Sequence, residues 1–281
     1  MFERISRSWG LVKASGTILM QDKQLMVFPL ISSVATILVG ACFILPMLGL
    51  GALDGLSDGA AHTRVYVVAF LFYTSQYFVI FFFNAALVGA AMKRMDGGSP
   101  SVRDGLNIAM SKIGSIFGYA LIAATVGMIL RAIQERVGFV GKIIVGLLGV
   151  GWTMATFLVV PVLVSSDVGP ADAVKQSATL LKKTWGENVI GQAGLGSAFV
   201  LMMFGVILSG IVLLIGAALT DSVALMIFAV IISGVAVILL ALIHAALSGI
   251  YAAALYRYAT DGKETPGFDP RVLEGAFAQK K

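Results

Sequence analysis

His244 and Ser248 are the residues whose types and spacing best suit chemistry inside a long apolar segment of this chain. Because they lie four residues apart, the two side chains share one face of a helix. A histidine buried in a membrane bundle needs a polar partner, so we expect His244 to form a structural hydrogen bond to a neighbouring helix. We expect the Ser248 hydroxyl to donate to the main-chain carbonyl of His244.

Other roles for His244 stay open: a substrate or proton site, a haem ligand, or a catalytic group. The only other histidine, His62, falls in a loop between apolar segments, so the bundle contains no histidine pair. Residues 246–249 (Ala-Leu-Ser-Gly) faintly resemble the serine motif of rhomboid proteases, but those enzymes bring serine and histidine from different helices. Gln192 and the glycines around it are further candidates to line a cavity with His244.

Several kinds of chemistry find no support in the residues. No charged residue lies in the middle of an apolar segment, whereas ion-coupled transporters and intramembrane aspartyl proteases need one. The chain has no H-E-x-x-H motif and no phosphate-binding loop. The single cysteine, Cys42, excludes an intramolecular disulfide and a zinc site with several cysteines. We therefore expect a non-enzymatic protein that holds no metal or cofactor.

The composition predicts that lipid is the solvent. Hydrophobic residues make up 58% of the 281 residues, charged residues 12%, and the mean hydropathy is +0.94. So few charges cannot cover the surface of a globule of this size. The fold class that follows is an all-α polytopic membrane bundle. Six apolar runs are long enough to cross a bilayer: about 25–51, 65–92, 114–133, 143–166, 189–219 and 223–258.

Three short basic stretches precede these segments in a regular order, at residues 2–18, 100–113 and 170–186. Each has apolar residues at helical spacing and basic residues elsewhere, which is typical of an amphipathic helix. We expect three hairpins of membrane-spanning helices, each preceded by one such helix. The domain prediction is one membrane domain, 1–259, made of units 1–92, 99–166 and 170–259, followed by a polar tail, 260–281.

The spacing of apolar residues predicts which side chains of the second and third amphipathic helices face inward. The inward residues are Val102, Leu106, Ala109 and Ile113 in one helix and Val174, Ala178, Leu181 and Trp185 in the other. The outward residues of the 100–113 helix include Arg103, Asp104, Asn107, Ser111 and Lys112.

The charge distribution predicts the orientation. Sixteen of the 20 lysine and arginine residues fall on one side of the six segments. By the positive-inside rule, both termini and all three basic helices are cytoplasmic, in the cell's inner membrane. Membrane lipids are the expected partners, and nucleic acid is not, because the basic residues lie at the ends of the apolar runs. The candidates to contact lipid headgroups are Arg4, Arg7, Lys13, Arg103, Lys112, Lys175, Lys182 and Lys183.

Small residues recur every four positions in the last segment, at Ala241, Ala245, Gly249 and Ala253. Such a stripe lets another backbone approach closely. It predicts either a central place for this helix in the bundle or a face for a second copy of the chain.

Several motifs resemble a bacterial multi-pass membrane family of unknown function. They are Phe2-Glu3-Arg4-Ile5 with Trp9-Gly10-Leu11, Asp22-Lys23 with Phe28-Pro29-Leu30, Ser177 with Leu181-Lys182-Lys183-Thr184-Trp185-Gly186-Glu187-Asn188, and Gly267-Phe268-Asp269 with Ala276-Phe277. The helix pattern is also similar to the membrane domain of some glycerophosphodiester phosphodiesterases, although the chain lacks their catalytic barrel and acidic metal ligands. The resemblance implies an integral membrane location and no particular activity.

Three functional hypotheses follow. The leading one is a non-enzymatic inner-membrane protein that binds lipid or a protein partner through its basic helices. The second is a transporter or channel for a small or lipid-like substrate, with Gln192 and His244 lining the path. The third is an intramembrane enzyme that uses Ser248 and His244.

Overall fold

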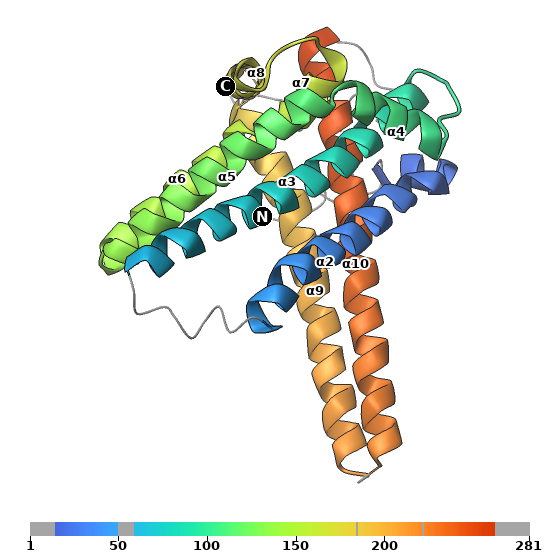
Figure 1. Cartoon of the computed structure of the whole chain (residues 1–281). Helices are drawn as coiled ribbons and strands as arrows, with labels where there is room; N and C mark the ends of the chain where they lie inside the picture. The colour runs from blue at the N-terminus through green and yellow to red at the C-terminus, as the bar shows by residue number, and fades with distance from the viewer. Residues whose placement is uncertain (1–14, 50–58, 184, 221, 262–281) are drawn as a thin grey trace.

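The computed structural model describes residues 15–49, 59–183, 185–220 and 222–261, and every regular element in those ranges is a helix (Figure 1). Most of the first predicted amphipathic helix, including Arg4, Arg7 and Lys13, lies outside the described residues, as does residue 262 onward in the tail. The helices run in the order η1 (Lys23–Met26), α2 (Val27–Gly49), α3 (Gly59–Met95), α4 (Val102–Ser111), α5 (Ile113–Arg136), α6 (Phe139–Ala155), α7 (Val159–Ser165), α8 (Pro170–Lys183), α9 (Trp185–Ala218) and α10 (Val223–Asp261).

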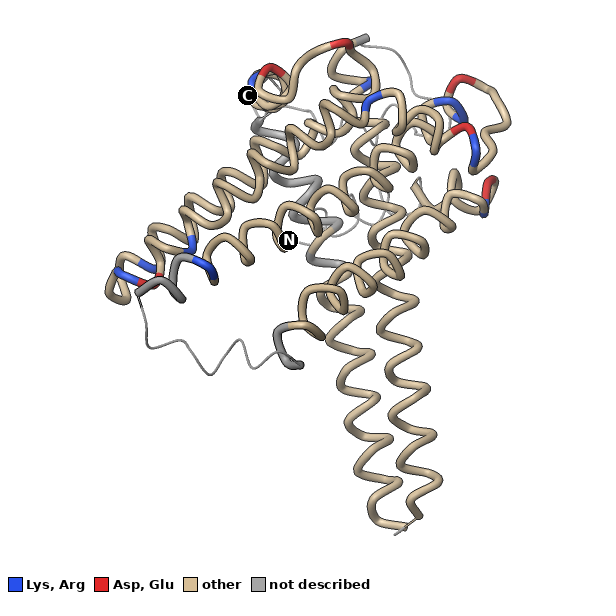
Figure 2. The backbone as a smooth tube through the Cα atoms, in the orientation of Figure 1, with Lys and Arg blue, Asp and Glu red and all other residues tan. Residues whose placement is uncertain are grey.

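Six helical segments of the described chain are long and apolar enough to cross a membrane, which confirms the six predicted spans and the all-α class. They correspond to α2, α3, α5, α6 with α7, α9 and α10. Figure 2 shows charged residues at the ends of these helices, while their middles are uncharged. Arg64, Arg131, Arg136 and Lys142 mark one end of the bundle.

The packed core lies toward the opposite end of the bundle. Buried residues concentrate in the second half of α3 (85–91), in α7 and in the last third of α10 (246–255). By contrast, α9 and the first half of α10 expose large apolar side chains on most sides and extend together beyond the other helices (Figure 1). We call the end that carries Met95, Lys112, Ser165 and Arg257 the packed end. Lipid is the natural solvent for the apolar surface beyond it.

A capping box starts α4. The Ser101 hydroxyl accepts a hydrogen bond from the Asp104 main-chain N–H (3.2 Å), and the Asp104 carboxylate accepts from the Ser101 N–H (2.8 Å). The same carboxylate lies 3.2 Å from the Lys93 ammonium. The Ser101 N–H, the Ser101 hydroxyl, which also donates to this carboxylate (2.8 Å), and the Lys93 ammonium lower the pKa of Asp104 to about 2. The main-chain N–H groups of Ser101 and Asp104 are thereby both hydrogen-bonded.

Two basic side chains tie loops together at the packed end. The Lys112 ammonium donates to the Ser166 carbonyl (3.1 Å) and lies 3.2 Å from the Asp167 carboxylate. The Arg257 guanidinium lies 2.7 Å from the carboxylate of Asp96, which joins the end of α10 to the loop after α3. The prediction that Lys112 points outward is therefore wrong: its side chain is only 21% exposed because it bridges to the α7–α8 connection.

The fourth predicted span, residues 143–166, is confirmed as one apolar segment, Phe139–Ser165, but it is not one continuous helix. It breaks between α6 and α7, at residues 156–158. Pro161 explains the position of the break. Its ring has no N–H and would clash with the carbonyl of the residue four positions earlier, Phe157, in a continuous helix.

A serine from α8 satisfies the backbone groups that this break sets free. The Ser177 hydroxyl donates to the Ala155 carbonyl (2.6 Å) and accepts from the Leu158 N–H (3.1 Å). Ser177 is completely buried. Backbone that leaves the helix at membrane depth needs such internal partners, because lipid offers none. The packing of α8 against α6 and α7 therefore holds the break in place.

The buried faces of α4 and α8 differ in detail from those predicted. In α4, Ala109 is buried as expected, but Gly105 is buried too and Ile113 is 41% exposed at the start of α5. In α8, the fully or nearly buried residues are Ala173, Ser177 and Leu181, one position off the predicted Val174 and Ala178. Trp185 was placed in the third amphipathic helix, but α8 ends at Lys183 and Trp185 begins α9.

Candidate functional site

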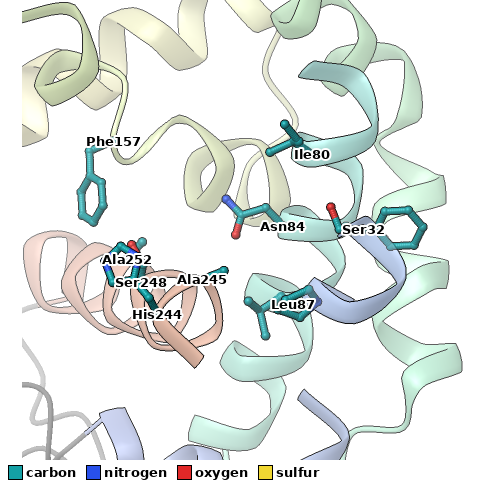
Figure 3. Close-up of a pocket in the computed structure, with 12 residues that line it drawn as sticks. Ser32, Ile80, Asn84, Leu87, Phe157, His244, Ala245, Ser248 and Ala252 are labelled. Carbon is teal, nitrogen blue, oxygen red and sulfur yellow. The ribbon is translucent and has the colours of Figure 1, made fainter. Parts of the chain in front are cut away.

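A pocket of about 330 Å³ lies between α2, α3 and α10, beside the break that separates α6 from α7 (Figure 3). Four uncharged polar side chains of the described residues line it: Ser32 of α2, Asn84 of α3, and His244 and Ser248 of α10. The apolar lining consists of Pro29, Ile80, Phe83, Leu87 and Phe157, and three small residues of α10, Ala245, Gly249 and Ala252. The structure therefore brings the predicted pair His244 and Ser248 to the wall of a cavity.

The crossing of α3 and α10 forms one side of the pocket and brings Gly249 into close contact with side chains of α3. A Cβ atom at Gly249 would lie 2.6 Å from Cδ2 of Leu87 and 3.1 Å from Oδ1 of Asn84. A side chain at this position would therefore force Leu87 into another rotamer and crowd Asn84. Gly249 and Ala253 are buried at this crossing, as the small-residue stripe predicted, whereas Ala241 and Ala245 are exposed. The end of the stripe with Gly249 and Ala253 is therefore packed, and the end with Ala241 and Ala245 leaves space.

His244 contacts an aromatic ring. Its imidazole lies 4.6 Å, between ring centroids, from Phe199 of α9. Within the described residues its side chain has no hydrogen-bond partner, so the predicted interhelical hydrogen bond of His244 is not found there. The predicted bond from the Ser248 hydroxyl to the His244 carbonyl is likewise absent between these two described residues. Both side chains keep their hydrogen-bonding capacity.

Asn84 and Ser32 are pocket residues that sequence reasoning missed. Asn84 is a polar residue in the middle of an apolar, aromatic-rich helix, and this signal could have found it. Ser32 gives no such signal, because serine is common in membrane helices and usually bonds to its own backbone. Gln192, the third predicted polar site residue, belongs to α9, but its side chain lies outside the described part of the structure.

Some polar groups elsewhere in the spans bond within the protein, whereas the buried hydroxyls of Thr74, Ser233 and Tyr251 have no hydrogen-bond partner among the described residues. The Gln76 amide nitrogen of α3 donates to the Thr36 carbonyl of α2 (3.1 Å). The Arg131 guanidinium donates to the Tyr73 hydroxyl (2.7 Å) and pairs with Glu135 (3.0 Å) at the end of the bundle away from the core. A smaller pocket of about 200 Å³ adjoins Tyr73 and Arg131. These bonds fix helix pairs, so they differ from the unbonded groups at the larger pocket.

In the described part of the chain no three His, Cys, Asp or Glu side chains gather closely enough to hold a metal ion. The larger pocket offers instead neutral groups that both donate and accept hydrogen bonds. Such a set can orient an uncharged polar group among apolar walls.

The predicted headgroup-contacting residues form a second candidate site. Arg103 of α4 and Lys182 of α8 are exposed at the packed end. Lys175 of α8 is exposed as well and pairs with Asp172 (3.1 Å). The Lys112 ammonium pairs with the Asp167 carboxylate. The side chain of Lys183 lies outside the described part of the structure.

A protein-family model described as a family of unknown function (DUF6159) matches residues 63–267. The match begins inside α3 and runs through the end of α10, so it includes Asn84, His244 and Ser248 and leaves out Ser32. No curated protein matches the chain. Because the family model covers most of its length, the chain belongs to this family of unknown function.

Proposed function

We propose that the protein is a non-enzymatic integral protein of the inner membrane, and that its packed end lies in the cytoplasm and binds anionic lipid headgroups. The observation that carries this proposal is the separation of charge along the bundle. Exposed cations of α4 and α8 lie at the packed end, and few basic residues mark the other end. Lysine and arginine at the cytoplasmic surface are attracted to anionic lipids by about 1 kcal/mol each.

In this proposal the six spans act as three hairpins, α2 with α3, α5 with α6 and α7, and α9 with α10. Each hairpin starts from a basic helix that lies along the cytoplasmic surface. The contacts of α2 with α3 and of α9 with α10 support this arrangement. So does the place of α4 and α8 directly before α5 and α9 in the chain.

We expect the wild-type protein to retain phosphatidylglycerol in preference to phosphatidylethanolamine when both are present in equal amounts. A variant with Lys175, Lys182 and Lys183 replaced by alanine should lose most of that preference. At about 1 kcal/mol per cation the attraction falls by roughly 3 kcal/mol. Native mass spectrometry of protein released from mixed-lipid nanodiscs measures the ratio of the two bound lipids.

The matched control replaces Arg136 and Lys142, at the other end of the bundle, with alanine. This control should retain the wild-type lipid ratio. An equal loss in both variants would mean that charge anywhere on the protein attracts the lipid. An unchanged ratio in the triple variant would remove α8 from the proposed lipid site.

A further inference from the structure

Among the described residues, the polar groups that line the larger pocket form no hydrogen bond within the protein, although they lie at membrane depth. Ser248 is nine residues before Arg257 on α10, so about 13 Å of helix separates the pocket from the charged end. The hydrocarbon half-thickness of a bilayer is about 15 Å. The pocket therefore lies inside the hydrocarbon region, below the level of lipid headgroups.

The unbonded groups of the pocket converge on one cavity, whereas other hydroxyls of the described spans either bond to the backbone or, as at Thr74 and Ser233, are buried without a partner. Ser33 donates to the Leu30 carbonyl (2.8 Å) and Thr153 to the Gly149 carbonyl (2.9 Å), as hydroxyls in membrane helices usually do. Among the described residues, the side chains of Ser32, Asn84, His244 and Ser248 form no hydrogen bond with the protein. A polar group without a partner in an apolar environment costs free energy. Four such groups on three helices, converging on one cavity, point to a ligand.

The lining defines the chemistry of that ligand. Among the described residues the lining contains no charged side chain, so it offers no counter-ion for a phosphate, carboxylate or ammonium group at this depth. The Asn84 amide and the two serine hydroxyls can donate to a carbonyl or accept from a hydroxyl. Ile80, Leu87 and Phe157 supply apolar surface for the rest of the molecule. The cavity volume of about 330 Å³ lies within the range of small-molecule sites.

We propose that this pocket binds a membrane-soluble molecule whose polar part is an uncharged hydroxyl or carbonyl group, with Asn84 and Ser248 as the central hydrogen-bonding residues. The molecule reaches the pocket from the lipid. This site is separate from the anionic headgroup contacts at the packed end. The proposal for the pocket holds whether or not those headgroup contacts are found.

The test uses the full-length protein in lipid nanodiscs with three photoreactive probes: a diacylglycerol, a quinone with an alkyl tail, and a phosphatidic acid. We expect the diacylglycerol or the quinone to label peptides of α3 and α10, and the one that labels identifies the source of the uncharged group. Ala245→Phe, which fills the pocket from α10, should reduce that labelling at least fivefold. Asn84→Leu, which keeps the volume but removes the hydrogen bonds, should reduce it about threefold or more.

Ala241→Phe is the matched control, because it adds the same bulk one turn away on an exposed position that does not line the pocket. It should label like the wild type. Melting curves in the same nanodiscs show which variants are folded. If Ala245→Phe is not folded, two other results test the proposal: the labelling of Asn84→Leu, and competition by unlabelled dioctanoylglycerol or decylquinone for labelling of the wild type. Absence of labelling by both uncharged probes, equal labelling by phosphatidic acid, or unchanged labelling in Asn84→Leu would overturn the proposal.

Discussion

Gly105→Ala is expected to lower the free energy of unfolding by about 2–3 kcal/mol. Gly105 packs α4 so closely on its neighbours that a Cβ atom would lie 2.5 Å from Cζ of Phe28 and 2.6 Å from the carbonyl oxygen of Ala86. A side chain could turn away, but the carbonyl belongs to the backbone of α3 and cannot move without shifting the helix. The gain in helix propensity from alanine, about 1 kcal/mol, offsets only part of this cost. Unfolding in a mixed-micelle titration measures the difference.

Gly114→Ala provides the matched control for Gly105→Ala. Gly114 lies at the start of the next helix, α5, and no atom lies within 4 Å of the position of its Cβ. Alanine there should leave stability unchanged or raise it by up to about 1 kcal/mol. Equal stability of the Gly105→Ala variant and the wild type would show that α4 does not pack on α3 and α2 as described.

Ser177→Ala is expected to destabilise the protein by about 2–3 kcal/mol, although it removes only one oxygen atom. The loss leaves the Leu158 N–H buried without a partner, and it removes the donor to the Ala155 carbonyl. Each unsatisfied backbone group of this kind costs about 1–3 kcal/mol. The backbone amides of residues 156–158 should also exchange hydrogen faster in the variant, which mass spectrometry measures directly.

Thr179→Ala on the same helix serves as the control for Ser177→Ala. The Thr179 hydroxyl is exposed and donates to its own helix, at the Lys175 carbonyl (2.9 Å). Its removal should change stability by less than about 0.5 kcal/mol. If both variants were equally stable, the Ser177 hydroxyl would not be what holds the helix break.

The large-scale architecture of this chain was predictable because apolar run length is a strong signal. Segments 65–92 and 223–258 match the helical spans that the structure contains, to within a few residues. The break in the fourth span was harder to predict, because Pro161 lies near the end of its apolar run. A proline there is consistent with either a helix end or a break. The side chain that bonds to the broken backbone, Ser177, comes from another helix. The residue pattern around Pro161 gives no signal of that contact.

The pocket was predictable only in part, for a related reason. His244 was conspicuous as a histidine in an apolar segment, and Ser248 followed from helical spacing. Their convergence with Asn84 and Ser32 depends on how α2 and α3 cross α10, where Gly249 lies close to Leu87 and Asn84. Close approaches at single glycines, such as Gly105 and Gly249, are properties of helix pairs, so one helix's periodicity does not reveal them.

The orientation in the membrane is the central claim of the proposed function, and cysteine accessibility tests it most directly. The chain has one cysteine, Cys42, so a Cys42→Ser background allows single cysteines to be introduced cleanly. Ser222→Cys reports on the short connection between α9 and α10, and Arg103→Cys reports on α4 at the packed end. A membrane-impermeant maleimide added to intact cells should label Ser222→Cys at once and Arg103→Cys only after the membrane is permeabilised. Labelling of Arg103→Cys in intact cells, with Ser222→Cys protected, would reverse the orientation and contradict the proposed cytoplasmic lipid site.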